Sequence, residues 1–222
     1  MCGRFTLTLP PDLIAEAFGL DDVPILEARY NIAPTQPVAV VRRLGDGAPR
    51  QLDLLTWGLT LSPVEGGRRG GPLINARSES VAARSSFRDA FRRRRCLVPA
   101  DGFYEWAHAQ GRRQAFHVRR KDGRPFAMAG LWEPEEHGAP ASCLILTTEP
   151  NELLRPIHDR MPVILDPADY DRWLAPESAD PVSLAALLRP HPPQPLEARP
   201  VGPAVNNARN EGPACLDPAR LV

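Results

Sequence analysis

The chain consists largely of short strand-like segments that follow one another without a regular exchange between strand and helix. Residues 38–44 and 51–57 flank Gly45-Asp46-Gly47, which predicts a hairpin. Asp122-Gly123 predicts a second, exposed hairpin turn. Regular βαβ alternation is missing, which argues against a doubly wound sheet and favours a mostly antiparallel α+β fold. Further strands are predicted at 96–99, 103–108, 114–119, 126–132, 142–148 and 162–165.

The remaining segments predict short helices at the periphery and one proline-rich stretch. Phe87 and Phe91 lie four residues apart, as expected on one face of a helix over 78–94. Residues 190–203 are rich in proline and are interpreted as a covering loop or a linker. A length of 222 residues favours a single domain over 1–222, although two domains are possible. The other helices are predicted at 10–19, 149–157, 168–174 and 182–188.

Net charge, hydropathy and cysteine spacing argue against a uniformly basic nucleic-acid-binding protein, a membrane-spanning protein and a domain held by zinc or disulfides. The formal net charge is zero, so any binding of nucleic acid must come from a local patch. No apolar run is long enough to span a membrane, and the N-terminus does not resemble a signal peptide. The four cysteines lack metal-ligand spacing, so we expect no metal, no disulfide framework and a cytoplasmic location.

Primary amines are scarce, which draws attention to the N-terminus. Of the 27 basic residues only Lys121 is a lysine, and it lies in the predicted turn. If Met1 is removed, the chain begins with Cys2, which then carries an α-amine and a thiol on adjacent carbons. An α-amine has a pKa of about 8, so it can attack an aldehyde, and the thiol can then close a thiazolidine ring. Alternatively, Cys2 follows Met1 by accident.

Three further groups of residues have both a chemical and a structural interpretation. Asn75 and Arg77 could orient a nucleophile and hold a phosphate, or they could belong to an ordinary helix N-terminus. Glu105 lies among aromatic residues, where desolvation would raise its pKa, or it faces solvent on an edge strand. His158, beside Asp159 and Arg160, is a candidate general acid–base group or a surface histidine.

A fourth group suits single-stranded nucleic acid. Trp57 is followed by the basic pair Arg68 and Arg69, and aromatic rings stack bases while arginines hold phosphates. The arginine run at 92–95 has the alternative interpretation of a solvated helix end.

Taken together, these motifs resemble the SRAP family (SOS-response-associated peptidases, also called abasic-site processing proteins). The resemblance extends over essentially the whole chain and implies the SRAP fold, with mostly antiparallel sheets forming a barrel-like core. The matching segments are MCGRF at 1–5, RYNIAPTQ at 29–36, WG at 57–58, INARSE at 74–79, CLVPADGFYEW at 96–106, FAMAGLWE at 126–133, TTEPN at 147–151, IHDRMPVIL at 157–165 and VNNARNEG at 205–212.

The resemblance implies a covalent reaction with an abasic site in single-stranded DNA. Cys2 would form a thiazolidine with the aldehyde of the ring-opened deoxyribose, shielding the lesion. Asn75 would position the N-terminus and sugar, Glu105 would shuttle protons, and His158 would assist ring opening or crosslink reversal. Autoproteolytic loss of Met1 and weak lyase activity at abasic sites are also implied, with no cofactor.

The resemblance also implies a DNA-binding surface on a monomer. Arg77 and Arg160 match phosphate-binding arginines, and Arg4, Pro34 and Trp57 lie in segments that match the DNA surface. One departure is that the family pattern WGxxPxW lacks its second tryptophan here, which Arg68 and Arg69 could offset.

Two other functions remain open from the residues. An N-terminal-nucleophile cysteine amidohydrolase would also expose Cys2 and use its thiol against an amide. A non-enzymatic single-strand-binding module would make Cys2 incidental.

Overall fold

The computed structural model describes residues 2–45, 47–59, 71–109, 112–136, 138–175 and 180–219. Met1 and the basic pair Arg68 and Arg69 therefore lie outside the described residues.

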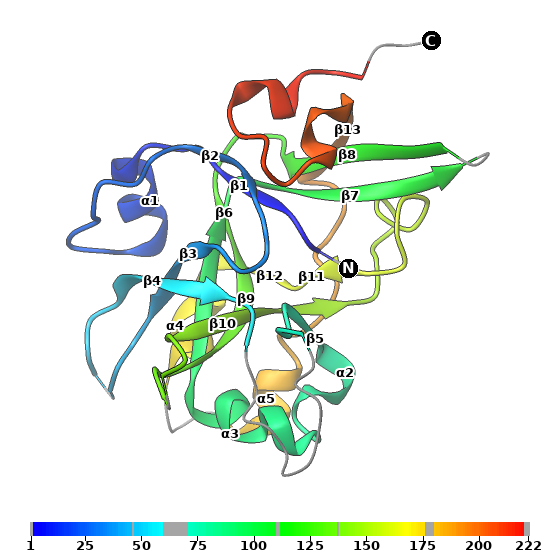
Figure 1. Ribbon diagram of the computed structural model, residues 1–222. Helices are drawn as coiled ribbons and strands as arrows, with labels where there is room; N and C mark the ends of the chain where they lie inside the picture. Colours follow the sequence, from blue (N-terminus) through cyan, green and yellow to red (C-terminus); the bar gives the residue numbers. More distant parts are fainter. Residues whose placement is uncertain are drawn as a thin grey trace.

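The first sheet has five strands and carries the N-terminal strand in its interior. Its order is β13-β8-β7-β1-β2, and all its pairings are antiparallel. β1 therefore has neighbours on both sides, with Phe5 opposite Phe103 of β7 and opposite Ile32 of β2. The first strand, drawn in blue, runs between β7 and the second sheet (Figure 1). The strands are β1 (Phe5–Leu7), β2 (Arg29–Ile32), β7 (Gly102–Ala109), β8 (Arg112–Arg120) and β13 (Leu196–Val201).

The second sheet closes into a barrel. β3 pairs with β4 and β6, β6 pairs with β9, and β10 pairs with both β9 and β4. β5 pairs with β10 in parallel, whereas β11 pairs with β10 and β12 pairs with β9 in the antiparallel direction. The antiparallel, barrel-like α+β fold expected from the sequence is thus confirmed. The strands are β3 (Pro37–Arg42), β4 (Gln51–Trp57), β5 (Asn75–Arg77), β6 (Arg95–Ala100), β9 (Phe126–Glu133), β10 (Ser142–Thr148), β11 (Met161–Pro162) and β12 (Ile164–Leu165).

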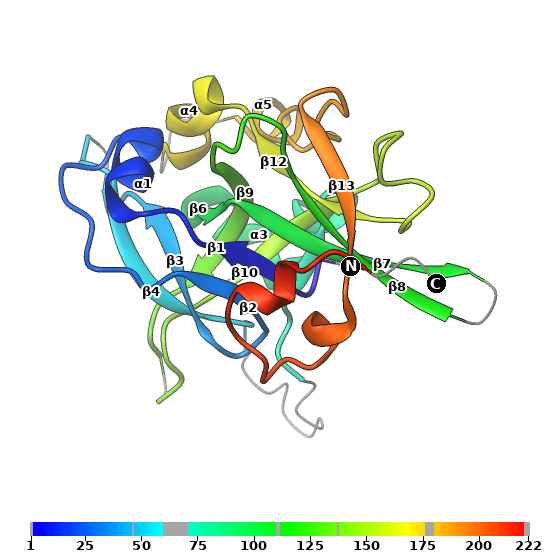
Figure 2. The same cartoon turned by 90° about the horizontal axis from the view of Figure 1, so that it is seen from above.

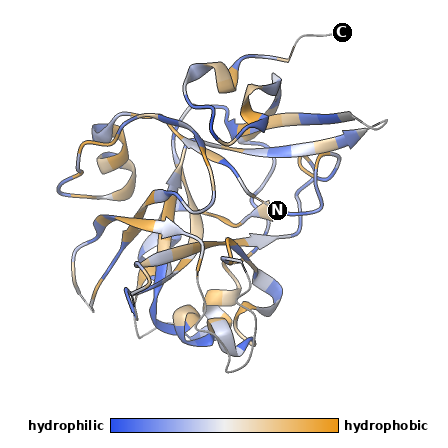
Figure 3. Cartoon of the chain, viewed as in Figure 1, coloured by the Kyte–Doolittle hydropathy of each residue, from blue (hydrophilic) through white to orange (hydrophobic). Residues whose placement is uncertain are grey.

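Short helices pack around the outside of the two sheets (Figures 1 and 2). The ring of Phe18 in α1 stacks on Tyr170 of α4, with 5.6 Å between ring centroids. The arginine-rich end of α3 is hydrophilic, whereas its buried face consists of Phe87, Ala90 and Phe91 (Figure 3). The helices are α1 (Pro11–Phe18), α2 (Ser78–Val81), α3 (Ser85–Arg93), η1 (Pro167–Asp169), α4 (Tyr170–Leu174), α5 (Pro181–Ala185), η2 (Pro203–Asn206) and η3 (Pro213–Leu216).

Several local predictions were wrong. The helix predicted over 78–94 is two helices, because Val81 and Phe87 are both buried but lie about 120° apart on one continuous helix. Residues 149–157 form turns rather than a helix. Gly123 has the expected positive φ of 72°, but β8 and β9 belong to different sheets, so no hairpin forms there. Residues 190–203 include β13, which pairs with β8, and therefore are not a linker.

The core is shared by both sheets and the helices that cover them. A smaller cluster joins Tyr104 and Trp106 of β7 to Val205 and Cys215 near the C-terminus. No helix in the described part of the chain is long and apolar enough to cross a membrane.

Candidate functional site

Cys2 lies shortly before β1, separated from it by Gly3 and Arg4, and is fully buried. Backbone pairing holds this segment in place, because the Tyr104 N–H donates to the Arg4 carbonyl at 2.9 Å. Burial raises the pKa of the Cys2 thiol, and the negative charge of Glu105 raises it further. The thiol is therefore protonated at neutral pH and needs a base before it can react.

Asn75 binds the main chain of Cys2. Its Nδ2 donates to the Cys2 carbonyl oxygen at 2.8 Å. The parallel pairing of β5 with β10, in which Asn75 lies opposite Ile145, sets the position of this side chain. The Asn75 Oδ1 is buried and accepts no hydrogen bond from a residue that the structure describes. Asn75 can thus hold the N-terminal residue and keeps one acceptor for another group.

Glu105 and His158 are two titratable side chains that lie close together in this region. Glu105 on β7 is only 1% exposed, and burial, together with a smaller contribution from the charge of Asp159, raises its pKa to about 7. Its Oε2 lies 3.8 Å from Nε2 of His158. Near neutral pH the carboxyl group is therefore divided between its acid and base forms, which suits proton transfer in both directions.

The tautomer of His158 follows from its neighbours. Nδ1 accepts the Arg160 main-chain N–H at 3.0 Å, so in the neutral ring the proton belongs on Nε2, facing Glu105. Burial lowers the pKa of His158, which keeps the ring neutral at pH 7. The Asp159 carboxylate also lies 2.9 Å from Nδ1, but this side chain is 85% exposed and water weakens its effect.

The residues expected to bind DNA occupy different environments. Arg77 is exposed at the end of β5, and Pro34 is half-buried in the loop between β2 and β3. The Arg4 Nη1 donates to Asn31 Oδ1 and to the Val205 carbonyl, both at 2.8 Å.

Arg160 is already paired with a carboxylate. Its two Nη atoms contact the two oxygens of Glu79 at 2.6 and 2.9 Å, and Nη2 also donates to the Thr147 carbonyl. A phosphate would therefore have to displace Glu79 from this bidentate contact.

Trp57 does not offer a stacking surface, so the expectation that its ring lines the DNA surface was wrong. Its side chain is fully buried and lies edge-on to Phe5, with ring centroids 5.2 Å apart. Its Nε1 donates to the Ile74 carbonyl at 2.9 Å. Because Ile74 precedes Asn75, Trp57 supports the strand that holds Cys2.

Sequence analysis missed a buried polar group between β1 and β7. The Thr6 hydroxyl donates to Asp101 at 2.5 Å and lies 3.1 Å from Nε2 of His117. Burial lowers the pKa of His117 to about 4, so the ring is neutral. A Cβ atom on Gly102 would lie 2.0 Å from this ring, which explains a glycine at this position. These contacts support the register in which Thr6 lies opposite Gly102 of β7.

His158 also lines an open groove of about 530 Å³. Trp106, His108 and Arg155 contribute to its lining together with apolar residues. In the described ranges, no group of three or more His, Cys, Asp or Glu side chains could hold a metal ion.

Comparisons with known proteins identify one family. A family model described as SOS response associated peptidase (SRAP) matches residues 1–208. The abasic site processing protein YoqW of Bacillus subtilis (strain 168) is 38% identical over 224 residues, covering 98% of this chain and 99% of that protein. The abasic site processing protein YedK of Escherichia coli (strain K12) is 32% identical over 229 residues, covering 98% of this chain and all of that protein. HMCES of Rattus norvegicus, also named an abasic site processing protein, is 30% identical over 274 residues, covering 100% of this chain and 77% of that protein.

Solved structures show the same fold. A Bacteroides thetaiotaomicron protein superposes with a TM-score of 0.83 at 22% identity, covering 99% of this chain and 100% of that chain. A Bordetella bronchiseptica protein superposes with a TM-score of 0.73 at 26% identity, covering 90% of this chain and 100% of that chain.

Proposed function

The chain belongs to the SOS response associated peptidase (SRAP) family, and on that premise we propose that it processes abasic sites by crosslinking to them through Cys2. The curated relatives named abasic site processing proteins support the general function. The observation that carries the chemical proposal is the group around Cys2. Asn75 holds its carbonyl, and Glu105, with a pKa of about 7, raises the pKa of its thiol through its charge.

The reaction requires the α-amine of Cys2, so Met1 must first be removed by hydrolysis of its peptide bond. The free amine adds to C1′ of the ring-opened deoxyribose and forms a carbinolamine. The acid form of Glu105 then donates a proton to the carbinolamine hydroxyl, which leaves as water and gives an imine.

Ring closure uses the same carboxyl group in the reverse direction. The Cys2 thiol is held neutral by burial, so it must lose its proton as sulfur attacks the imine carbon. Glu105, now a carboxylate, accepts this proton as the carbon–sulfur bond forms. The imine nitrogen, which kept its proton when water left, takes up the electron pair of the C=N bond, and a thiazolidine results. The neutral His158, with its proton on Nε2, is suited to donate to the sugar ring oxygen during ring opening.

Single-stranded DNA is the proposed substrate, bound by a monomer. Arg77, Arg4 and Pro34 lie on elements adjoining this site, and Arg160 joins them if a phosphate displaces Glu79. Weak cleavage of the strand by β-elimination would follow from the same imine. The amidohydrolase and simple binding alternatives have no comparable supporting observation.

The decisive experiment mixes purified protein with labelled single-stranded DNA carrying one abasic site. Wild type should give an adduct that survives heating in denaturant. Cys2→Ala keeps an α-amine after loss of Met1, so it should give an adduct only when borohydride traps the imine. A heat-stable adduct with Cys2→Ala in the absence of borohydride, or none with wild type whose Met1 is shown by mass spectrometry to be absent, would refute the proposal.

A further inference from the structure

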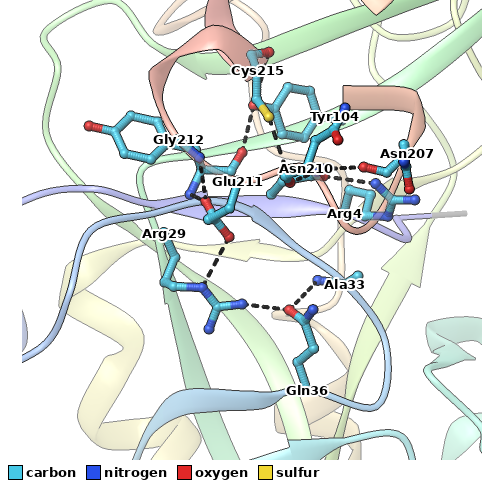
Figure 4. Close-up of polar contacts among 12 residues, drawn as sticks. Arg4, Arg29, Ala33, Gln36, Tyr104, Asn207, Asn210, Glu211, Gly212 and Cys215 are labelled. Carbon is cyan, nitrogen blue, oxygen red and sulfur yellow. Dashed lines mark hydrogen bonds and ion pairs between the residues drawn. The ribbon is translucent and has the colours of Figure 1, made fainter. Parts of the chain in front are cut away.

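The VNNARNEG segment at 205–212 forms much of the C-terminal cover over the first two strands (Figures 2 and 4). Asn31 of β2 is fully buried, and its Nδ2 donates to the carbonyls of Asn207 at 3.0 Å and Asn210 at 2.9 Å. Its Oδ1 accepts from Arg4, which also donates to the Val205 carbonyl. The segment is therefore fastened to β2 and to Arg4, which follows the proposed nucleophile by two residues.

Glu211, in the same segment, contacts Arg29 and Tyr30 of β2. Its Oε1 accepts the N–H of Tyr30 at 2.5 Å and that of Gly212 at 3.1 Å. Its Oε2 accepts from Arg29 Nε at 3.2 Å. Burial alone would raise the pKa of Glu211, but these donors outweigh it and lower the pKa, so the group is a carboxylate at neutral pH.

Arg29 connects Glu211 to the loop between β2 and β3. Its Nη2 donates to Oε1 of Gln36 at 2.5 Å, and the same oxygen accepts the Ala33 N–H at 3.1 Å. Figure 4 shows the continuous series of polar contacts from Glu211 through Arg29 and Gln36 to Ala33.

This loop has a backbone conformation that needs support. Thr35 has a φ of 70° and is the one non-glycine residue in the left-handed region within the described ranges. A β-branched residue is a genuine outlier there, and such conformations persist only where surrounding contacts impose them. The Thr35 N–H donates to the Trp57 carbonyl at 2.8 Å, and the Trp57 N–H donates to the Gln36 carbonyl at 2.9 Å. The loop presents half-buried Pro34 and exposed Thr35.

We propose that Glu211 is a positioning residue for DNA capture, which acts through Arg29 and Gln36 to hold the Pro34–Thr35 loop in its strand-binding conformation. The inference rests on the proposed function, in which this loop contacts the single strand. A half-exposed ion pair contributes little by itself, but Glu211 accepts three hydrogen bonds as an anion, and such bonds are stronger than neutral ones.

The test compares Glu211→Gln with the matched control Glu197→Gln. Glu197 on β13 also pairs with arginines, accepting from Arg119 at 2.8 Å and Arg199 at 3.1 Å. Three quantities are measured: amide hydrogen exchange over residues 33–37 without DNA, the dissociation constant for intact single-stranded DNA, and the crosslinking rate at saturating abasic DNA.

We expect Glu211→Gln to speed exchange in the loop about tenfold and to raise the dissociation constant about fivefold, because the lost carboxylate frees the loop. The saturated crosslinking rate should stay within about twofold, since Cys2 and Glu105 are not contacted. Glu197→Gln should change none of the three. Thr35→Gly removes the need for support, so Glu211→Gln should have a smaller effect on affinity in that background.

Unchanged loop exchange or unchanged affinity in Glu211→Gln would overturn the inference, as would a loss confined to the saturated rate. If Glu211→Gln does not fold, Arg29→Lys interrupts the same series while keeping the charge, and the same outcomes decide. If wild type forms no adduct, the proposed function fails, whereas the exchange measurement still decides whether Glu211 orders the loop.

Discussion

The carbonyl oxygen of Cys2 accepts a hydrogen bond of 2.8 Å from Nδ2 of Asn75, so this residue is tied through its main chain, whereas its thiol makes only a long contact of 4.0 Å with the Arg4 carbonyl. The α-amine and the thiol are thereby left available for reaction, while the carbonyl group that joins Cys2 to the rest of the chain is held in place. Positioning of this kind can contribute several orders of magnitude to a rate.

Asn75→Leu should therefore lower the crosslinking rate at saturating DNA by about 10- to 100-fold. Stability should change by only about 1 kcal/mol, because one hydrogen bond is lost and the unpaired buried Oδ1 is removed with it. Single-turnover kinetics and denaturant unfolding measure the two effects. A large loss of stability with an unchanged rate would contradict a positioning role for Asn75.

Glu105→Gln should remove proton transfer and lower the crosslinking rate by about 10²- to 10⁴-fold. In wild type the rate should change with pH near 7, where the Glu105 carboxyl group titrates, and this inflection should vanish in the variant. Single-turnover rates between pH 5 and 9 at saturating DNA test both statements. An inflection near pH 7 that persists in Glu105→Gln would assign it to another group.

The same variant should be more stable than wild type at alkaline pH. Folded protein keeps a proton on Glu105 up to about pH 7, whereas the unfolded chain releases it near pH 4.3, so wild type loses stability as pH rises through this window. Glu105→Gln avoids this loss, which amounts to at most about 4 kcal/mol. Urea unfolding at pH 4 and pH 8 should show no advantage at the lower pH and the full advantage at the higher.

Glu79→Gln should tighten the binding of single-stranded DNA severalfold, because it releases Arg160 from its bidentate pair. If Arg160 then contacts a phosphate, the slope of log K against log salt should steepen by about 0.7. Glu133→Gln is the control, since it removes the same charge from the partner of Arg94. An equal effect of both variants would indicate net charge instead of a local contact.

Trp57→Leu should destabilise the fold without weakening the binding of intact DNA. The buried ring is lost together with its hydrogen bond to Ile74, which should cost about 3 kcal/mol. A stacked tryptophan would instead contribute about 1–3 kcal/mol to DNA binding. Thermal unfolding and fluorescence anisotropy with intact single strands separate these two roles.

Local patterns in the sequence predicted much of the fold but not the partners of each strand. The β3–β4 hairpin was predicted because its turn and both strands are adjacent in sequence. Closure of the barrel by β9 and β10 joins segments whose pairing no local pattern records. The break between α2 and α3 arises because two buried positions face different neighbours.

The candidate site was likewise predicted only in part. Asn75, Glu105 and His158 were found because their motifs carry chemistry, and the structure brings Asn75 to Cys2 and His158 to Glu105. Glu211 and Thr35 were missed as individual residues, because the importance of Glu211 lies in contacts across 181 and 182 positions and that of Thr35 lies in a backbone angle. Trp57 was misassigned because sequence cannot distinguish a buried tryptophan from an exposed one.

The interior position of β1 has a consequence for the timing of activity during synthesis. The first residues to leave the ribosome pair with β7, about a hundred residues later, and are covered by a segment that ends near residue 212. Contacts between positions so distant form late in folding. The reactive end of a nascent chain therefore meets Glu105 and Asn75 only after nearly all of the polypeptide has been made. A truncated chain that exposes the same cysteine lacks the neighbours that would make it reactive toward DNA.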